Sequence, residues 1–204
     1  MKKTVFVIVI ALLTMLNVDA QKVKIESGNL AFLKGQTKIN FNFDYSVMKV
    51  DSKSEKAYVE EQVKSKNKEK KGSGDEWKTD WETSYRTDFF QKKVIEDFNT
   101  VTESIALEGG YFEDAPYTVT IKTTVIDPGV SAGPFTRPSM VSVEAIFSKT
   151  NSTDVLAKIA IEEAKSGNYD MANKFYDIGR IASAFGEAGE NLGDAVIKAL
   201  KKVK

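Results

Sequence analysis

Alternation of apolar and polar side chains over residues 39–47 limits the possible folds of this chain more than any other segment. The apolar positions are Ile39, Phe41, Phe43, Tyr45 and Val47, and the residues between them are Asn40, Asn42, Asp44 and Ser46. Successive side chains of a strand point to opposite faces, so this pattern predicts a strand with one buried and one solvated face.

Three further stretches show the same two-residue period, at 117–125, 141–147 and 155–161. The first ends at Asp127-Pro128-Gly129, which is a strong turn signal because proline lacks an N–H donor and glycine tolerates positive φ. We expect residues 130–138 to form an irregular loop. The last two stretches flank a polar turn, which predicts an antiparallel hairpin.

Helical periodicity predicts helices over about 54–66, 75–102 and 170–202, the last with a possible break near Gly189. Gly186, Gly189 and Gly193 in the last helix indicate close backbone approach, a bend or a cap. A lysine-rich run followed by Gly72-Ser73-Gly74 predicts a mobile charged loop near 64–75.

Together these elements predict an α+β fold. We expect a mixed or antiparallel sheet of about four to five strands, with helices packed on one face, including a long C-terminal helix.

The first 20 residues predict a secretion signal. Lys2 and Lys3 precede an apolar run that is too short to span a bilayer, and small residues end at Ala20. We therefore expect export to the periplasm or beyond, an N-terminal arm over 21–37, and a single α/β envelope domain over 38–204. A lipoprotein is not expected because the chain has no cysteine to carry a lipid.

Composition excludes several classes of function. The chain contains no histidine and no cysteine, which removes histidine-based triads, thiol nucleophiles and ordinary zinc sites, and no phosphate-binding glycine loop occurs. The 29 basic residues balance the 29 acidic ones, so no net charge attracts nucleic acid. We expect no cofactor, no metal and no catalytic residue.

Trp77, Trp81 and Tyr85 recur every four residues in the long predicted helix. Such a row usually packs into a core, and we favour that interpretation. The alternative is that the tryptophans are exposed and bind a partner, because tryptophan is enriched at interface hot spots. The predicted partner-binding residues are Trp77, Trp81, Tyr85, Asp127, Pro128 and Gly129, within the surfaces at 72–85 and 127–138.

Acidic residues leave a carboxylate-dependent hydrolase formally open. One group consists of Asp75, Glu76, Asp80, Glu82 and Asp88, and a second consists of Glu113 and Asp114. The first group is typical of a solvated helix face, and the second precedes a strand in a turn. We regard the enzymatic interpretation as the weakest.

Several local motifs resemble an uncharacterised family of secreted proteins from Bacteroidetes-type bacteria. They are GNLAFLKGQ at 28–36, FDYS at 43–46, GSGDEW at 72–77, YTVTIKTTVIDPG at 117–129 and RIASAFGEAGENLG at 180–193. The order of elements is also similar to the N-terminal domain of TolB and the periplasmic domain of the curli-secretion lipoprotein. The resemblance implies a secreted envelope protein and no assigned activity.

The first hypothesis is therefore an exported, non-enzymatic module that binds an envelope protein or assists surface assembly. A second hypothesis is a carrier or receptor for a small apolar ligand, with a cavity lined by aromatic side chains of the first strand and the long helix. The carboxylate-dependent hydrolase is the third.

Overall fold

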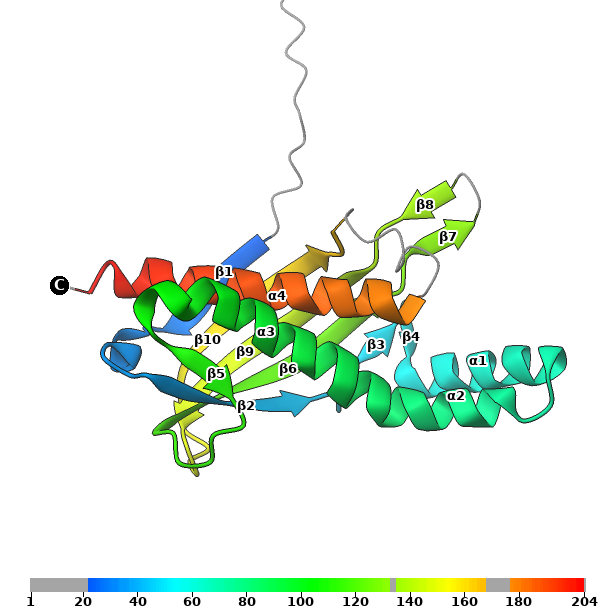
Figure 1. Cartoon of the computed structure of the whole chain (residues 1–204), viewed down its shortest axis with the longest axis horizontal. Coiled ribbons are helices and arrows are strands. Elements are labelled where there is room, and N and C mark those ends of the chain that lie inside the picture. Colours follow the sequence, from blue (N-terminus) through cyan, green and yellow to red (C-terminus); the bar gives the residue numbers. More distant parts are fainter. Residues whose placement is uncertain (1–21, 133–134, 168–176, 204) are drawn as a thin grey trace, which may run out of the picture.

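The computed structural model describes residues 22–132, 135–167 and 177–203 (Figure 1). The predicted signal peptide lies outside these residues. The main sheet contains β1 (Lys22–Gly28), β2 (Lys38–Asp44), β3 (Lys49–Val50), β4 (Lys53–Ser54), β5 (Glu108–Gly110), β6 (Tyr117–Asp127), β9 (Met140–Lys149) and β10 (Val155–Lys165). A separate hairpin consists of β7 (Val130–Ala132) and β8 (Phe135–Arg137). The helices are α1 (Glu55–Glu69), α2 (Ser73–Glu82), the π-helix η2 (Tyr85–Gln91), α3 (Lys92–Thr102) and α4 (Asp177–Leu200), with short 3-10 turns η1 (Ala31–Leu33) and η3 (Glu103–Ile105).

The α+β class, the mixed sheet and the long C-terminal helix are confirmed, but the prediction of four to five strands is wrong. The main sheet has eight strands, in the order β1-β10-β9-β6-β2-β5, with β3 paired to β6 and β4 paired to β3. Strand β2 lies parallel to both β5 and β6, while β6, β9, β10 and β1 are antiparallel neighbours. The missed strands β3, β4 and β5 have only two or three residues, too few to show a period.

The predicted N-terminal arm is part of the sheet. Strand β1 pairs antiparallel with β10, and Val23 lies opposite Ile161. The segment that follows turns through η1 and buries Leu30 and Leu33 in the core. Val23 and Ile25 alternate with charged residues over 22–26, which is a short local strand signal, and pairing with β10 places this strand in the sheet.

The antiparallel hairpin of β9 and β10 is confirmed. The first strand stops at Asp44, earlier than predicted, because the Asp44 carboxylate accepts a 2.8 Å hydrogen bond from the Ser46 N–H and starts a turn. The region 130–138 contains the β7–β8 hairpin, so the prediction of an irregular loop there is wrong.

The predicted mobile loop near 64–75 is mostly helical. Helix α1 continues to Glu69, and α2 begins at Ser73. The Asn67 side chain accepts hydrogen bonds from the N–H groups of Gly72 and Gly74, at 3.0 and 2.9 Å, so α1 itself caps the start of α2. The α1–α2 hairpin extends beyond one end of the sheet (Figure 1).

The long helix predicted over 75–102 is interrupted. It divides at Thr83, whose φ of −124° and ψ of −92° are not helical, and it resumes as the π-helix η2 before α3. Helix α4 runs through Gly189 without a break. Of the three explanations offered for its glycines, close approach is correct at this position, because a Cβ on Gly189 would lie 2.2 Å from the Val94 carbonyl oxygen of α3.

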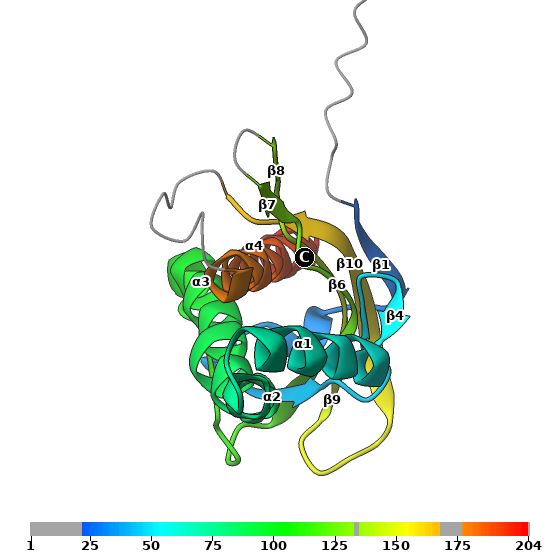
Figure 2. The same ribbon diagram turned by 90° about the vertical axis from the view of Figure 1, so that its right-hand side faces the viewer.

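The core lies between one face of the sheet and the pair α3 and α4, which cover that face side by side (Figure 2). Alternate residues of β6, β9 and β10 are buried there, including Val119, Ala145 and Ile159. The rings of Phe90 and Phe185 stack at 4.8 Å between η2 and α4. The residues between the buried ones are half-buried, as expected for the uncovered face.

Candidate functional site

A pocket of about 470 Å³ lies where α1, α2, η2 and the first turn of α4 meet. Its aromatic lining consists of Tyr58, Trp77, Tyr85 and Phe89, and Lys66 and Asp177 supply its charges. We call it the aromatic pocket. Two of the predicted partner-binding residues, Trp77 and Tyr85, therefore line one open site.

The two tryptophans of α2 stack on each other but have different exposure. Their ring centroids are 5.3 Å apart, with 24° between the planes. Trp81 is 1% exposed, and its indole N–H donates a 2.8 Å hydrogen bond to Glu55, so it belongs to the core. Trp77 is half-buried, and the Lys66 ammonium lies 5.6 Å from its ring centroid. Of the two tryptophans, only Trp77 is accessible to a partner.

The π-helix sets the positions of the other aromatic side chains. Tyr85 and Phe89 meet edge to face at 6.0 Å, and Phe89 is 44% exposed, whereas its neighbour Phe90 is buried. Phe89 continues the four-residue row of Trp77, Trp81 and Tyr85, and the core-facing interpretation of that row is wrong at this position. An α-helical period does not apply across a π-helical turn.

Polar contacts hold these elements together. Arg86 of η2 pairs with Glu55 at the start of α1, and its guanidinium lies 4.7 Å from the Tyr45 ring centroid. Burial raises the pKa of Tyr58 to about 12, with a smaller contribution from the charge of Asp177. The Tyr58 hydroxyl is therefore neutral at physiological pH. Asp177 also pairs with Arg180 at 2.5 Å.

The turn Asp127-Pro128-Gly129 lies at the base of the β7–β8 hairpin, outside the aromatic pocket. Asp127 pairs with Arg137 and accepts a 2.8 Å hydrogen bond from the Gly129 N–H, and Gly129 has a φ of +71°. The Pro128 carbonyl accepts a hydrogen bond from Ser139 at 2.6 Å. All three residues thus make contacts that shape the turn.

Several acidic residues of the first group make local structural contacts. The Asp75 carboxylate accepts from Asn67 at 3.4 Å, Glu82 pairs with Lys78 at 3.0 Å, and Asp80 accepts from Ser84 at 3.3 Å. Glu113 and Asp114 are exposed in the loop after β5. Within 22–132, 135–167 and 177–203, no cluster of three or more acidic residues could hold a metal ion.

The space between the first strand and the long helix is packed with side chains. The rings of Phe41 in β2 and Phe98 in α3 contact edge to face at 5.1 Å, and both residues are fully buried. A ligand cavity at that position, as the carrier hypothesis requires, would have to displace this contact.

In the part of the chain that the structure describes, no helix has the length and apolar character needed to cross a membrane.

No protein-family model and no curated protein matches this sequence. Two solved structures show a weak likeness. A PelC dodecamer from Paraburkholderia phytofirmans has a TM-score of 0.36 and 9% sequence identity, over 82% of this chain and 96% of that chain. The L→M variant of PelC from the same organism, also a dodecamer, has a TM-score of 0.34 with the same identity and coverage. At these values the likeness carries no argument about function.

Proposed function

We propose that the protein is an exported, non-enzymatic envelope module that binds another envelope protein through the aromatic pocket. The observation that carries this proposal is the exposure of Phe89 and Trp77 around one pocket beside the projecting α1–α2 hairpin. Export and an envelope location rest on the signal-like residues 1–20 and on the family resemblance of the sequence.

The pocket has features of a protein-binding hot spot. Aromatic side chains dominate such sites, and binding energy concentrates where a partner side chain enters a pocket that excludes water. Lys66 and Asp177 lie at the same pocket and offer polar contacts at its rim. Behind the pocket wall, the buried rings of Trp81 and Phe90 pack against each other with their centroids 5.9 Å apart, which supports the wall.

The test is crosslinked affinity capture from the native envelope fraction, using the tagged mature protein. Phe89→Ala removes an exposed aromatic wall of the pocket, and Tyr111→Ala, at a tyrosine that is 62% exposed outside the pocket, is the matched control. We expect one specific partner, crosslinked to α1, α2 or η2, that Phe89→Ala loses and Tyr111→Ala retains.

Both variants must show the wild-type melting temperature for the comparison to hold. Crosslinks that map elsewhere on the protein, or a partner that Phe89→Ala captures as well as wild type does, would contradict the proposal.

A further inference from the structure

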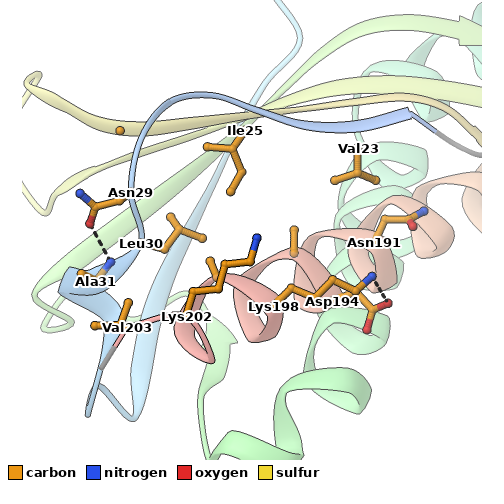
Figure 3. A pocket seen from close by; sticks show the side chains of 13 residues that line it. Val23, Ile25, Asn29, Leu30, Ala31, Asn191, Asp194, Lys198, Lys202 and Val203 are labelled. Atoms are coloured by element: carbon orange, nitrogen blue, oxygen red, sulfur yellow. Dashed lines mark hydrogen bonds and ion pairs between the residues drawn. The ribbon is translucent and has the colours of Figure 1, made fainter.

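A second hollow lies at the other end of α4, between β1 and the last turns of the helix (Figure 3). Its volume is about 650 Å³, within the range of roughly 300–1,000 Å³ typical of small-molecule sites. We call it the β1–α4 groove. It shares no lining residue with the aromatic pocket.

The groove has apolar walls from two elements. Val23 and Ile25 of β1 lie opposite Ile161 and Ile159 of β10, which are fully buried, so they are on the helix-covered side of the sheet. They remain 37% and 44% exposed, because β1 is the last strand and nothing in the described chain covers its outer edge. The other apolar lining residues are Leu30, Ala195, Ala199 and Val203.

The charged side chains that line the groove are Asp194, Lys198 and Lys202, so positive charge is in excess. Lys198 pairs with Asp194 of the previous turn at 3.2 Å. Lys202 has no ion pair among the described residues, and its ammonium end extends into the space between α4 and β1 (Figure 3). A lysine can lay its methylene stem along an apolar wall while its ammonium stays at the opening. The groove thus combines apolar walls with one unpaired cation.

We propose that the β1–α4 groove binds a single-chain anionic amphiphile, of the chemical class of a fatty acid. The apolar chain lies against Val23 and Ile25, where it removes exposed apolar surface from water. The anionic head lies beside Lys202, which pairs with no acidic side chain of the described residues. This site does not depend on the protein-binding function proposed above.

The headgroup distinguishes this ligand from other occupants. A neutral apolar molecule leaves Lys202 without a counterion, and a cationic amphiphile places a like charge beside it. An extended peptide at the free edge of β1 is bound through the backbone and needs no anionic group.

The experiment is titration of the mature protein with monomeric dodecanoate, followed by NMR shift mapping and calorimetry. Two matched pairs of variants are compared. Val23→Asp is paired with Val47→Asp, an exposed valine outside the groove, and Lys202→Glu is paired with Lys201→Glu, its exposed neighbour outside the groove.

We expect shifts at β1 and the last turns of α4. Val23→Asp and Lys202→Glu should each weaken dodecanoate binding by about tenfold or more. The Val23→Asp carboxylate would be buried against the alkyl chain of the ligand, and the Lys202→Glu carboxylate would repel the carboxylate of the ligand. Their matched partners should bind like wild type. Dodecyltrimethylammonium should bind at least about tenfold more weakly than dodecanoate.

Four results would overturn the proposal: no binding of dodecanoate by the folded wild type, shifts confined to other surfaces, equal affinity for the cationic amphiphile, or no difference within either matched pair. Binding only to vesicles of anionic phospholipid, with none to monomeric dodecanoate, would also overturn it, since it would identify a membrane surface as the ligand.

Discussion

Trp77 and Trp81 are identical residues one helical turn apart, yet they contribute to different properties of the molecule. Trp81 is enclosed by Tyr58 and Phe90, at centroid distances of 5.6 and 5.9 Å, and it is hydrogen-bonded to Glu55. The Trp77 ring stacks on the Trp81 ring and also lines the aromatic pocket. Replacement of both together would confuse a loss of folding with a loss of binding.

We therefore predict different stability effects for the two tryptophans. Trp81→Ala should lower the free energy of unfolding by about 3–5 kcal/mol, because it leaves a large cavity. Trp77→Ala should lower it by only about 1–2 kcal/mol, because part of its surface is already in water. Urea denaturation of each single variant gives both values. Equal losses would show that the two rings have the same burial.

Gly189 lies at the closest approach of α4 to α3. Alanine favours a helix by about 1 kcal/mol over glycine, but its Cβ would lie 2.2 Å from the Val94 carbonyl oxygen. We predict that Gly189→Ala destabilises the fold by about 1–3 kcal/mol, because backbone atoms must move apart. Glu190→Ala, at the exposed next residue, should change stability by less than about 0.5 kcal/mol. A Gly189→Ala protein as stable as wild type would argue against this contact.

The helical hairpin depends on a cap that crosses between its two helices. Asn67 of α1 accepts hydrogen bonds from two N–H groups at the start of α2. We predict that Asn67→Ala costs about 1–2 kcal/mol, since both donors lose their partner. Amide hydrogen exchange at Gly72 and Gly74 should become faster, and trypsin should cut sooner at Lys70 and Lys71. The exposed Lys68→Ala is the control, and unchanged exchange in Asn67→Ala would contradict the role of the cap.

The turn between β6 and β7 gives the fold a pH dependence. Burial raises the pKa of Asp127, but hydrogen bonds from Arg137 and Gly129 and the positive charge of Arg137 outweigh it, so the pKa lies below 3.8. A carboxyl with a lowered folded-state pKa stabilises the fold above its unfolded pKa. This contribution is lost as the pH falls through the folded value.

Asp127→Asn should therefore lower stability by about 0.5–1 kcal/mol at pH 7, and the difference from wild type should shrink steadily below about pH 4. Urea denaturation at a series of pH values measures this. Asp154→Asn, at an exposed acid in the turn between β9 and β10, serves as the control. A difference that stays constant down to pH 2 would show that the charge of Asp127 has no part in it.

At the scale of the whole molecule, β1 closes one side of the sheet. Its removal would expose the edge of β10 and uncover Ile159 and Ile161, which are now fully buried. We predict that a chain starting at Asn29 melts at least about 10 °C lower than a chain that includes β1 and that it associates through its new edge. Thermal unfolding and light scattering test both effects. Lys24→Ala in an intact β1 is the control, and an unchanged melting temperature after truncation would restore the interpretation of 21–37 as an arm.

The sequence alone predicts the elements whose signals are local. The two-residue periods of β2, β6, β9 and β10 and the periodic apolar face of α4 lie within single segments, and the polar turn after Lys149 is enough to pair β9 with β10. Of the predicted site residues, Trp77 and Tyr85 both line the aromatic pocket, although the single helix that their four-residue spacing predicts divides between them at Thr83.

Tertiary contacts decide the rest. The parallel pairing of β2 with β6 joins segments about 80 residues apart. Pairing with β10 decides where β1 lies in the sheet, and a π-helical turn places Phe89 outside and Phe90 inside. The aromatic pocket and the β1–α4 groove each form between elements that are distant in the chain. Local patterns record which way a side chain faces on its own strand or helix, whereas a site depends on which other elements that face meets.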